Sequence, residues 1–387
     1  DISPMEADHG IRALAMTAWK DFASATWKLQ RLMVERLNVA SHRCAVEKRD
    51  DFVLRSLLAE EKLPTLLHEL LVMEAWRNRV LTEMPLAPLL KNPVGVYMYC
   101  SYESQLVNLF ECLLYHAEAV EGLGDDVLEL IDYCWRNIAY CLLAPGDAIH
   151  EVDEMDPKAL MQLPDEERFQ RDAKQMGIQR ALSCVSILWF IVDRLKSLPL
   201  SVANAMLQKN DLVAGLADVL VAQPWMRRNG KVIQKFVNGQ FQTVTREDSL
   251  RVVPTEAHAW FCIHYFTCDV QCRKAYGFTQ NKKERILRVK RFLHETLVDQ
   301  IPALVDVQRA LEELSFLEPP VGTEEKFRAS LIVEQVPRIR QAIEGTAVWR
   351  TIREQFISKL IDPQAMHEDA VRLASLFDAL AEHMDVQ

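Results

Sequence analysis

Glycine is scarce in this sequence, with 12 in 387 residues. That is under half of the usual frequency of about 7%. Nucleotide-binding folds and all-β sandwiches use glycine freely in turns and at close backbone approaches, so its scarcity argues against both classes. The abundant residues are Leu, Ala, Glu and Arg, which favour helices. The composition therefore predicts a mostly helical protein.

A surplus of positive charge and a long apolar run are also missing. The formal net charge is −10, whereas a general nucleic-acid binder needs excess Lys and Arg to displace counterions from phosphates. The longest uncharged runs, which include residues 181–192 and 257–268, have 12 residues each, against the roughly 20 that a bilayer-spanning helix needs. We therefore expect no nucleic-acid partner and no membrane span.

The short motifs of common enzyme classes are absent as well. The sequence contains no Gly-x-Gly-x-x-Gly, no phosphate-binding Gly-Lys-Ser/Thr loop and no Gly-x-Ser-x-Gly turn. The pair His68-Glu69 starts a zinc-protease motif, but Val72 stands where the second histidine ligand is needed. The pair that begins at His294 fails in the same way. The sequence predicts no catalytic residues.

Apolar residues follow helical periodicity along most of the chain. In LPTLLHELLVM, one stripe consists of Leu63, Leu66, Leu67, Leu70 and Met73. Several helices are apolar on more than one face, as expected when each is packed between neighbours in a stacked array. Similar phrases recur at irregular spacing: PTLLHELL, SQLVNLFECLL, LVAGLADVLV and PALVDVQRAL. We predict an all-α fold, a degenerate armadillo- or HEAT-like helical solenoid.

Two stretches interrupt this pattern. Residues 146–175 are acidic, contain two prolines and lack a sustained apolar stripe. They predict a long loop between an N-terminal half of the solenoid, residues 1–145, and a C-terminal half, residues 176–387. Residues 231–245 alternate apolar and polar positions around a central Asn-Gly pair, which predicts one small β-hairpin.

The stretch HAWFCIHYFTCDVQC, residues 258–272, contains two histidines and three cysteines. If it is helical it spans about 21 Å, so at most a pair such as His258 and Cys262 can approach one ion. Its other residues are mostly apolar, and buried free cysteine behaves as a small apolar side chain. We therefore interpret the stretch as core, without a metal or other cofactor. A metal-dependent enzyme that uses His258 and Cys262 stays open as an alternative.

One stretch reverses the acidic balance of the chain. NKKERILRVKRF, residues 281–292, carries six basic residues: Lys282, Lys283, Arg285, Arg288, Lys290 and Arg291. A smaller basic group, Arg227, Arg228 and Lys231, precedes the hairpin. Such a stretch is either a solvated helix face or a docking surface for an acidic protein, because charge asymmetry steers encounter. We predict the six residues as a protein-binding site.

Several phrases, taken in order along the chain, resemble a known family. They are LPTLLHELLVMEAWRNRVL, VLELIDYCWRNIAYC, LSCVSILWFIVDRLKSLPLSVANAML, LVDQIPALVDVQRALEELSFLEPP and LIVEQVPRIRQAIEGTAVW. The chain is similar to the family of zinc finger MYND domain-containing protein 10, whose members are cytoplasmic factors for preassembly of axonemal dynein arms. The resemblance implies four kinds of partner: dynein subunits, a heat-shock chaperone, an immunophilin and a leucine-rich-repeat dynein assembly factor.

The sequence departs from that family in its cysteines. Members carry a C-terminal MYND finger, a two-zinc module built on closely paired cysteines, whereas the 9 cysteines here are scattered and form no Cys-x-x-Cys. We interpret the chain as the helical region without that finger, so zinc is expected only in the absent module. An odd number of scattered cysteines also fits a reducing compartment, and we expect a cytoplasmic protein.

Together these observations predict a scaffold, a co-chaperone adaptor in the cytoplasmic preassembly of axonemal dynein arms that binds its partners and does not catalyse. A helical solenoid offers an extended surface on which several partners can dock. Two alternatives stay open: a metal-dependent enzyme with an unrecognised all-helical site, and a purely structural protein-interaction domain.

Overall fold

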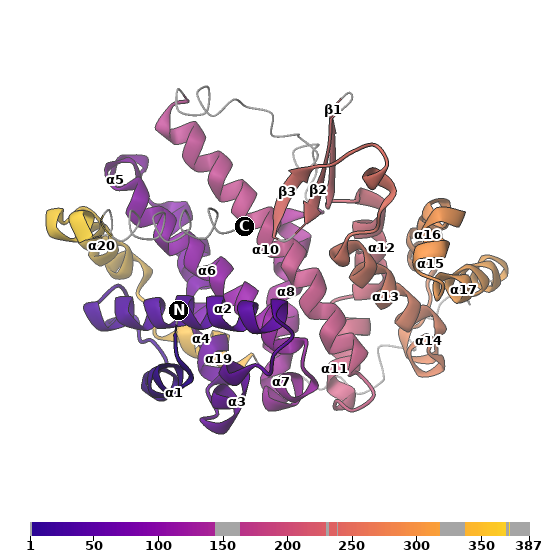
Figure 1. The fold of residues 1–387 in the computed structure, drawn as a ribbon, viewed down its shortest axis with the longest axis horizontal. Helices are drawn as coiled ribbons and strands as arrows, with labels where there is room; N and C mark the ends of the chain where they lie inside the picture. Colours follow the sequence, from indigo (N-terminus) through magenta and orange to yellow (C-terminus); the bar gives the residue numbers. More distant parts are fainter. Residues whose placement is uncertain are drawn as a thin grey trace. The chain divides into compact units, whose positions relative to one another are not determined.

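The structure is a computed structural model, and it describes residues 2–143, 163–229, 232–237, 239–317, 337–368 and 371. The described chain is helical almost throughout and contains one small three-stranded sheet (Figure 1). The predicted all-α class with a single small β element is thereby confirmed.

The described chain divides into two compact units. Unit 1 contains residues 2–109, 163–176, 338–368 and 371, and unit 2 contains residues 110–143 and the described residues from 177 to 337. This division differs from the predicted halves, which follow the order of the sequence. The physical reason lies in unit 1, where helices from distant parts of the sequence share one core.

Local side-chain capping fixes the starts of the first three helices of unit 1. Ser3 forms a capping box with Glu6, Ser24 accepts a hydrogen bond from the backbone N–H of Trp27, and Asp51 caps the helix after it. The elements are α1 (Pro4–Ala13), α2 (Ala25–Val46), α3 (Phe52–Ala59), α4 (Leu63–Arg79), η1 (Leu81–Glu83), α5 (Leu86–Lys91), most of α6 (Pro93–Leu114), the first turns of α10 (Asp165–Asp193), α19 (Arg338–Gly345) and α20 (Trp349–Leu360).

The core of unit 1 is an aromatic cluster. The ring of Trp27 stacks on that of Tyr99 with centroids 5.3 Å apart. Phe356 of α20 meets Tyr99 edge-on at 4.9 Å and Trp76 at 5.3 Å. All four side chains are buried, and each such ring pair contributes about 0.5–1.5 kcal/mol beyond the burial of its area. We call Trp27, Trp76, Tyr99 and Phe356 the aromatic cluster.

Polar contacts also hold the late helices α19 and α20 to the N-terminal part of unit 1. The indole Nε1 of Trp19 donates to the carbonyl of Ile343 at 2.9 Å, and Lys359 Nζ donates to the carbonyl of Phe22 at 2.7 Å. Helix α19 packs against α4. Helices α19 and α20 are therefore an integral part of unit 1.

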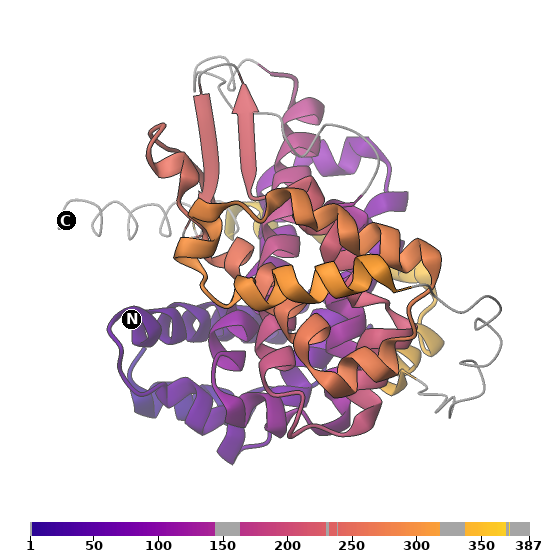
Figure 2. The same ribbon diagram turned by 90° about the vertical axis from the view of Figure 1, so that its right-hand side faces the viewer.

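Unit 2 continues the helical packing around a central helix, α13, which contacts both α12 and α17 (Figures 1 and 2). Its helices are α7 (Ala117–Gly122), α8 (Val127–Cys141), α10 from residue 177, α11 (Leu200–Asn204), α12 (Leu212–Ala222), α13 (Pro254–Cys268), α14 (Val270–Tyr276), α15 (Gln280–Leu287), α16 (Glu295–Gln300) and α17 (Leu304–Phe316). Short 3₁₀ or π turns lie between them: η2 (Gly124–Asp126), η4 (Ala205–Lys209), η5 (Asp248–Leu250) and η6 (Arg288–Phe292).

The sheet of unit 2 is antiparallel, with strand order β1-β2-β3. Its strands are β1 (Met226–Asn229), β2 (Val232–Val237) and β3 (Gln240–Thr243). The predicted hairpin is confirmed as β2–β3, in which Phe236 pairs with Phe241. Gly239 in its turn has a φ of +79°, which glycine adopts without strain. The sequence had not indicated β1.

Helix α10 begins inside the predicted acidic loop. Residues 165–175 are helical, because Asp165, Glu166 and Glu167 complement the positive end of the helix dipole and Arg168 pairs with Asp165. Residues 144–162 of that predicted loop lie outside the described chain. At 29 residues, α10 is long and apolar enough to cross a membrane, but 72% of its most apolar window is buried inside the protein. Such burial is typical of a core helix.

Candidate partner-binding surfaces

The histidine- and cysteine-rich stretch forms two helices rather than the single one that the sequence suggested. Helix α13 ends at Cys268, and Asp269 starts α14 by accepting hydrogen bonds from the N–H groups of Gln271 (2.9 Å) and Cys272 (3.0 Å). The prediction of a buried core holds for one face of α13, where Cys262 has no exposed surface. The neighbouring stripe of the same helix, which carries His258, Phe261 and Tyr265, is partly exposed.

His258 belongs to a short polar chain. Its Nδ1 lies 2.9 Å from the hydroxyl of Ser186, and burial lowers its pKa to about 4, so the imidazole is neutral at neutral pH. Desolvation raises the pKa of the Glu111 carboxyl, although hydrogen bonds from Ser183 and Ser186 oppose the shift. Serine stands between acid and histidine here, whereas a hydrolytic triad places histidine in the middle.

The cysteines of the stretch are held as neutral thiols. Burial raises the pKa of Cys262, and burial together with the Asp269 carboxylate raises that of Cys272 to about 12. Metals bind the thiolate, which these surroundings disfavour. Within the described ranges, no three His, Cys, Asp or Glu side chains gather closely enough to hold an ion.

The basic stretch divides into an inward and an outward group. Arg285 donates to Asp218 Oδ2 on α12 from Nε at 3.0 Å and from a terminal nitrogen at 2.7 Å. Lys282 lies 3.8 Å from an oxygen of Asp211 and 4.4 Å from the ring centroid of Tyr276. These contacts hold α15 against α12 and α14.

Lys283 also has an internal role. Its Nζ donates to the carbonyls of Ser315 (2.9 Å) and Leu317 (2.7 Å) at the end of α17. Carbonyls in the last turn of a helix have no partners inside that helix, so a lysine there satisfies them and complements the helix dipole. Three of the six predicted residues thus stabilise unit 2 itself.

The outward group consists of Arg288, Lys290 and Arg291, which we call the basic face. All three are exposed, because the chain leaves α15 at Leu287 and turns through η6. Arg288 lies 3.4 Å from Asp218 and Lys290 lies 4.0 Å from Glu312. Exposed pairs of this kind contribute about 0–1 kcal/mol, so they compete weakly with a partner.

The smaller basic group before the hairpin is split in the same way. Arg227 is buried, and its guanidinium carbon lies 3.6 Å from the ring centroid of Phe241. Arg228 is exposed at the outer end of β1. Lys231 lies outside the described residues.

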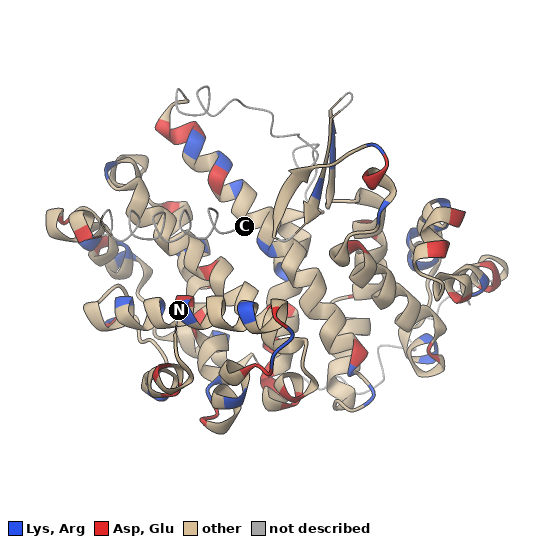
Figure 3. Cartoon of the chain, viewed as in Figure 1, with Lys and Arg blue, Asp and Glu red and all other residues tan. Residues whose placement is uncertain are grey.

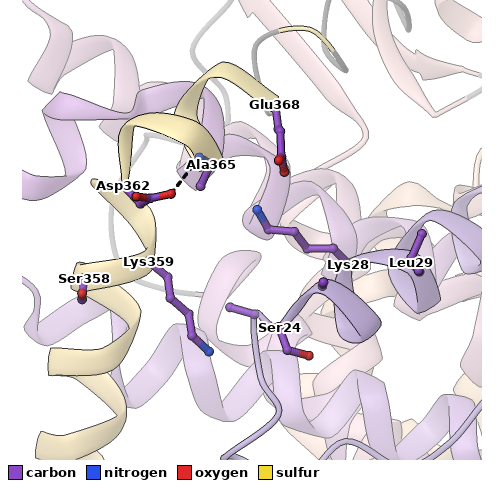
Figure 4. A pocket seen from close by; sticks show the side chains of 10 residues that line it. Ser24, Lys28, Leu29, Ser358, Lys359, Asp362, Ala365 and Glu368 are labelled. Carbon is purple, nitrogen blue, oxygen red and sulfur yellow. Dashed lines mark hydrogen bonds between the residues drawn. The ribbon is translucent and has the colours of Figure 1, made fainter.

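An open cavity in unit 1 was not visible in the sequence. Its volume is about 580 Å³, and Lys28 and Glu368 extend toward each other across it (Figure 4). Its charges are of both signs, so the cavity selects neither an anion nor a cation. The lining residues are Ala23, Ser24, Ala25, Lys28, Leu29, Ser358, Lys359, Asp362, Ala365 and Glu368. They come from segments more than 300 positions apart, a proximity that local patterns do not encode.

These features define a mostly helical protein that presents charged and aromatic side chains on its helix surfaces. No protein-family model and no solved structure matches the chain significantly. A curated relative from Drosophila melanogaster, the zinc finger MYND domain-containing protein 10 homolog, is 30% identical over 303 residues, or 77% of this chain. The chain belongs to the zinc finger MYND domain-containing protein 10 family, which confirms the resemblance. It spans 64% of the length of that relative.

Proposed function

We propose that this chain is the helical scaffold of a co-chaperone adaptor in the cytoplasmic preassembly of axonemal dynein arms. Its membership in the zinc finger MYND domain-containing protein 10 family carries the proposal. The partners in this proposal are dynein subunits, a heat-shock chaperone, an immunophilin and a leucine-rich-repeat dynein assembly factor. The scaffold binds these proteins and performs no chemistry on them.

The basic face supports this role with a concrete surface. Arg288, Lys290 and Arg291 are exposed in a chain whose net charge is −10. An acidic partner is steered toward such a face while the rest of the chain repels it, which fixes orientation as well as encounter rate. Binding through this face therefore weakens as salt rises.

The test is charge reversal in the full protein. A triple variant is expressed in cells that lack the protein, and it carries Arg288→Glu, Lys290→Glu and Arg291→Glu. At low salt it should capture dynein subunits or the chaperone about tenfold less, or weaker still, than the unsubstituted protein does. Dynein arms in the cilia, counted by electron microscopy, should fall in parallel. A matched control reverses three exposed basic residues elsewhere in unit 2: Arg246, Arg251 and Lys274.

The two variants separate the possible failures. If both variants capture the partners equally well and restore dynein arms equally well, the basic face is not part of the binding site. If the unsubstituted protein captures no dynein subunit and no chaperone, the adaptor role itself is wrong, and the purely structural or enzymatic alternatives gain support.

A further inference from the structure

The sheet of unit 2 has two edges, because its strand order is β1-β2-β3. The outer side of an edge strand presents backbone N–H and C=O groups that no neighbouring strand has taken. Folded proteins protect such edges with charged side chains, proline, a bulge or a covering segment, since an open edge pairs readily with another extended chain. The two edges of this sheet differ in that protection.

The edge formed by β1 is protected. Arg227 and Arg228 give this strand two positive charges, and the side chain of Arg228 is exposed. The N–H of Met226, at the start of the strand, donates to the carbonyl of Gln223 at 3.1 Å. A charged edge whose first outward N–H is already paired resists the addition of a further strand.

The edge formed by β3 lacks this protection. Its sequence, QFQT, contains no charged residue and no proline, and Figure 3 shows the strand without charge. Its register with β2 is continuous over all four residues, so it contains no bulge. Gln240, Gln242 and Thr243 are exposed, so no segment of the described chain covers the strand.

The hydrogen-bond pattern of the hairpin shows which backbone groups of β3 point outward. The N–H of Val244 donates to the carbonyl of Ile233 in β2 at 2.9 Å. In an antiparallel ladder every second residue exchanges hydrogen bonds with the neighbouring strand, so Gln242 also faces β2. Phe241 and Thr243 therefore direct their N–H and C=O groups away from the sheet. In the described part of the chain, none of these four groups has a hydrogen-bond partner.

Side chains hold this edge in place. The ring centroid of Phe241 lies 5.4 Å from that of Phe236 in β2 and 3.6 Å from the guanidinium carbon of the buried Arg227. Just beyond the strand, the hydroxyl of Thr245 accepts from the N–H of Asp248 at 3.1 Å and donates to its carboxylate at 2.7 Å. An edge that is already ordered loses little conformational entropy when a strand adds to it.

The open backbone groups identify the occupant by its secondary structure. N–H and C=O groups that repeat at every second residue pair with another extended chain, whereas a helix has already used its own backbone groups. A second copy of this chain would meet the first only along this short strand, far below the roughly 1,200 Å² that a specific interface between folded proteins buries. An extended segment of another protein needs only the edge itself.

The side chains of β3 decide which segment fits. Phe241 lies on one face of the strand, and Gln240 and Gln242 lie on the other. The best cross-strand neighbour of an aromatic ring is aromatic or β-branched, and an uncharged strand offers no compensation for a charge. We infer that β3 binds an extended, uncharged segment of a partner protein as a fourth strand of the sheet, with an aromatic or β-branched residue beside Phe241. The inference does not depend on the dynein-arm proposal, so either can fail alone.

A labelled peptide provides the test. In a fluorescein-labelled peptide of about eight residues, Val and Thr alternate, and Lys and Glu stand only at its ends. Titration with this chain should give saturable anisotropy with a dissociation constant below about 1 mM. The control peptide has the same side chains but N-methyl groups on its two central residues, which remove one N–H from each of its edges, and it should bind at least about tenfold more weakly. Equal binding of both peptides, or no saturable binding, would overturn the inference.

Substitutions at Thr243 connect the binding to the edge. Thr243→Pro removes an outward N–H but no hydrogen bond of the ladder with β2, and it should weaken peptide binding about tenfold or more. Thr243→Val is the matched control, because it keeps the N–H and a β-branched side chain, and it should bind the peptide as the parent does. Equal affinities of the two variants would contradict docking on this edge.

Amide hydrogen exchange, followed residue by residue by NMR, keeps the test informative if the proline variant folds poorly. In the unsubstituted chain the amide of Gln242 should exchange slowly and that of Thr243 fast. The peptide should slow Thr243 at least about tenfold and leave Gln242 unchanged. Slow exchange of Thr243 without peptide would show that the edge is already paired within the chain, and the inference would be wrong. Concentration-dependent self-association that Thr243→Pro abolishes, measured by sedimentation, would show instead that the occupant is a second copy of this chain.

Discussion

Both units are rich in aromatic residues, but they place them differently. In unit 1 the aromatic cluster is closed: Trp76 is 1% and Phe356 2% exposed. In unit 2 the rings of Trp189, Phe190, Phe261 and Tyr265 each keep part of their surface in solvent. Buried rings stabilise a fold through their full area, whereas partly exposed rings leave area for a partner to bury. The same residue types thus close a core in one unit and leave part of their area in solvent in the other.

A matched pair of substitutions tests this contrast most strongly. Phe356→Ala should lower the free energy of unfolding of unit 1 by about 3–5 kcal/mol, because it leaves a cavity in the aromatic cluster. Phe261→Ala should cost unit 2 only about 1 kcal/mol, since part of its ring is already in water. Hydrogen exchange read peptide by peptide assigns each loss to its unit. A larger loss for Phe261→Ala would reverse the comparison.

The next largest expected effect is a loss of stability of unit 2 at acidic pH. The unfolded pKa of His258 is 6.5 and the folded value about 4, so between these values only the unfolded chain binds the proton. Stability is therefore full above about pH 6.5 and falls by up to about 3 kcal/mol as the pH drops toward 4.

Chemical denaturation of the parent and of His258→Gln, at pH 7 and pH 4, measures this dependence. The amide can keep a hydrogen bond to Ser186 but does not titrate, so the parent should lose more stability than the variant. The Glu111 carboxyl, whose pKa is raised, works in the opposite direction in both proteins and cancels in the difference. Identical pH profiles would show that His258 is not buried as a neutral ring.

The smallest expected effect distinguishes the inward from the outward basic residues. Arg285→Ala removes two charge-assisted hydrogen bonds to Asp218 and should lower the free energy of unfolding by about 1–2 kcal/mol. Arg288→Ala removes one long, exposed contact and should cost less than about 0.5 kcal/mol. Thermal denaturation at low and high salt compares the two. Equal losses would show that the whole stretch is structural.

The sequence predicted the elements whose causes are local. Scarce glycine and helical periodicity predicted the all-α class, and the Asn-Gly pair predicted β2–β3 because that turn has its own chemistry. The start of α10 was missed, since the acidic residues that suggested a loop are the ones that favour a helix N-terminus. Strand β1 pairs only in the presence of β2, so nothing in its own four residues indicates it.

The surfaces were harder to predict, because they depend on contacts between distant residues. The sequence identified the basic stretch but could not separate Arg285 from Arg288, since the acceptor Asp218 lies on another helix. On α13 the spacing of His258, Phe261 and Tyr265 is that of one helix face. It was interpreted as core because apolar residues surround those positions on every side. Only the packing shows which face is left to solvent.

Unit 1 combines segments from the beginning and the end of the described chain, so its core cannot close until most of the chain has been synthesised. Tyr99 leaves the ribosome early, but Phe356, which completes its surroundings, lies 257 positions later. At about 5–20 residues per second, this gap lasts roughly ten to fifty seconds. Throughout that interval the apolar surface that Phe356 will cover stays open on Trp27, Trp76 and Tyr99. The described residues of unit 2 are all translated during the same interval. The nascent chain with its last helices still missing is therefore the form of this protein most exposed to aggregation.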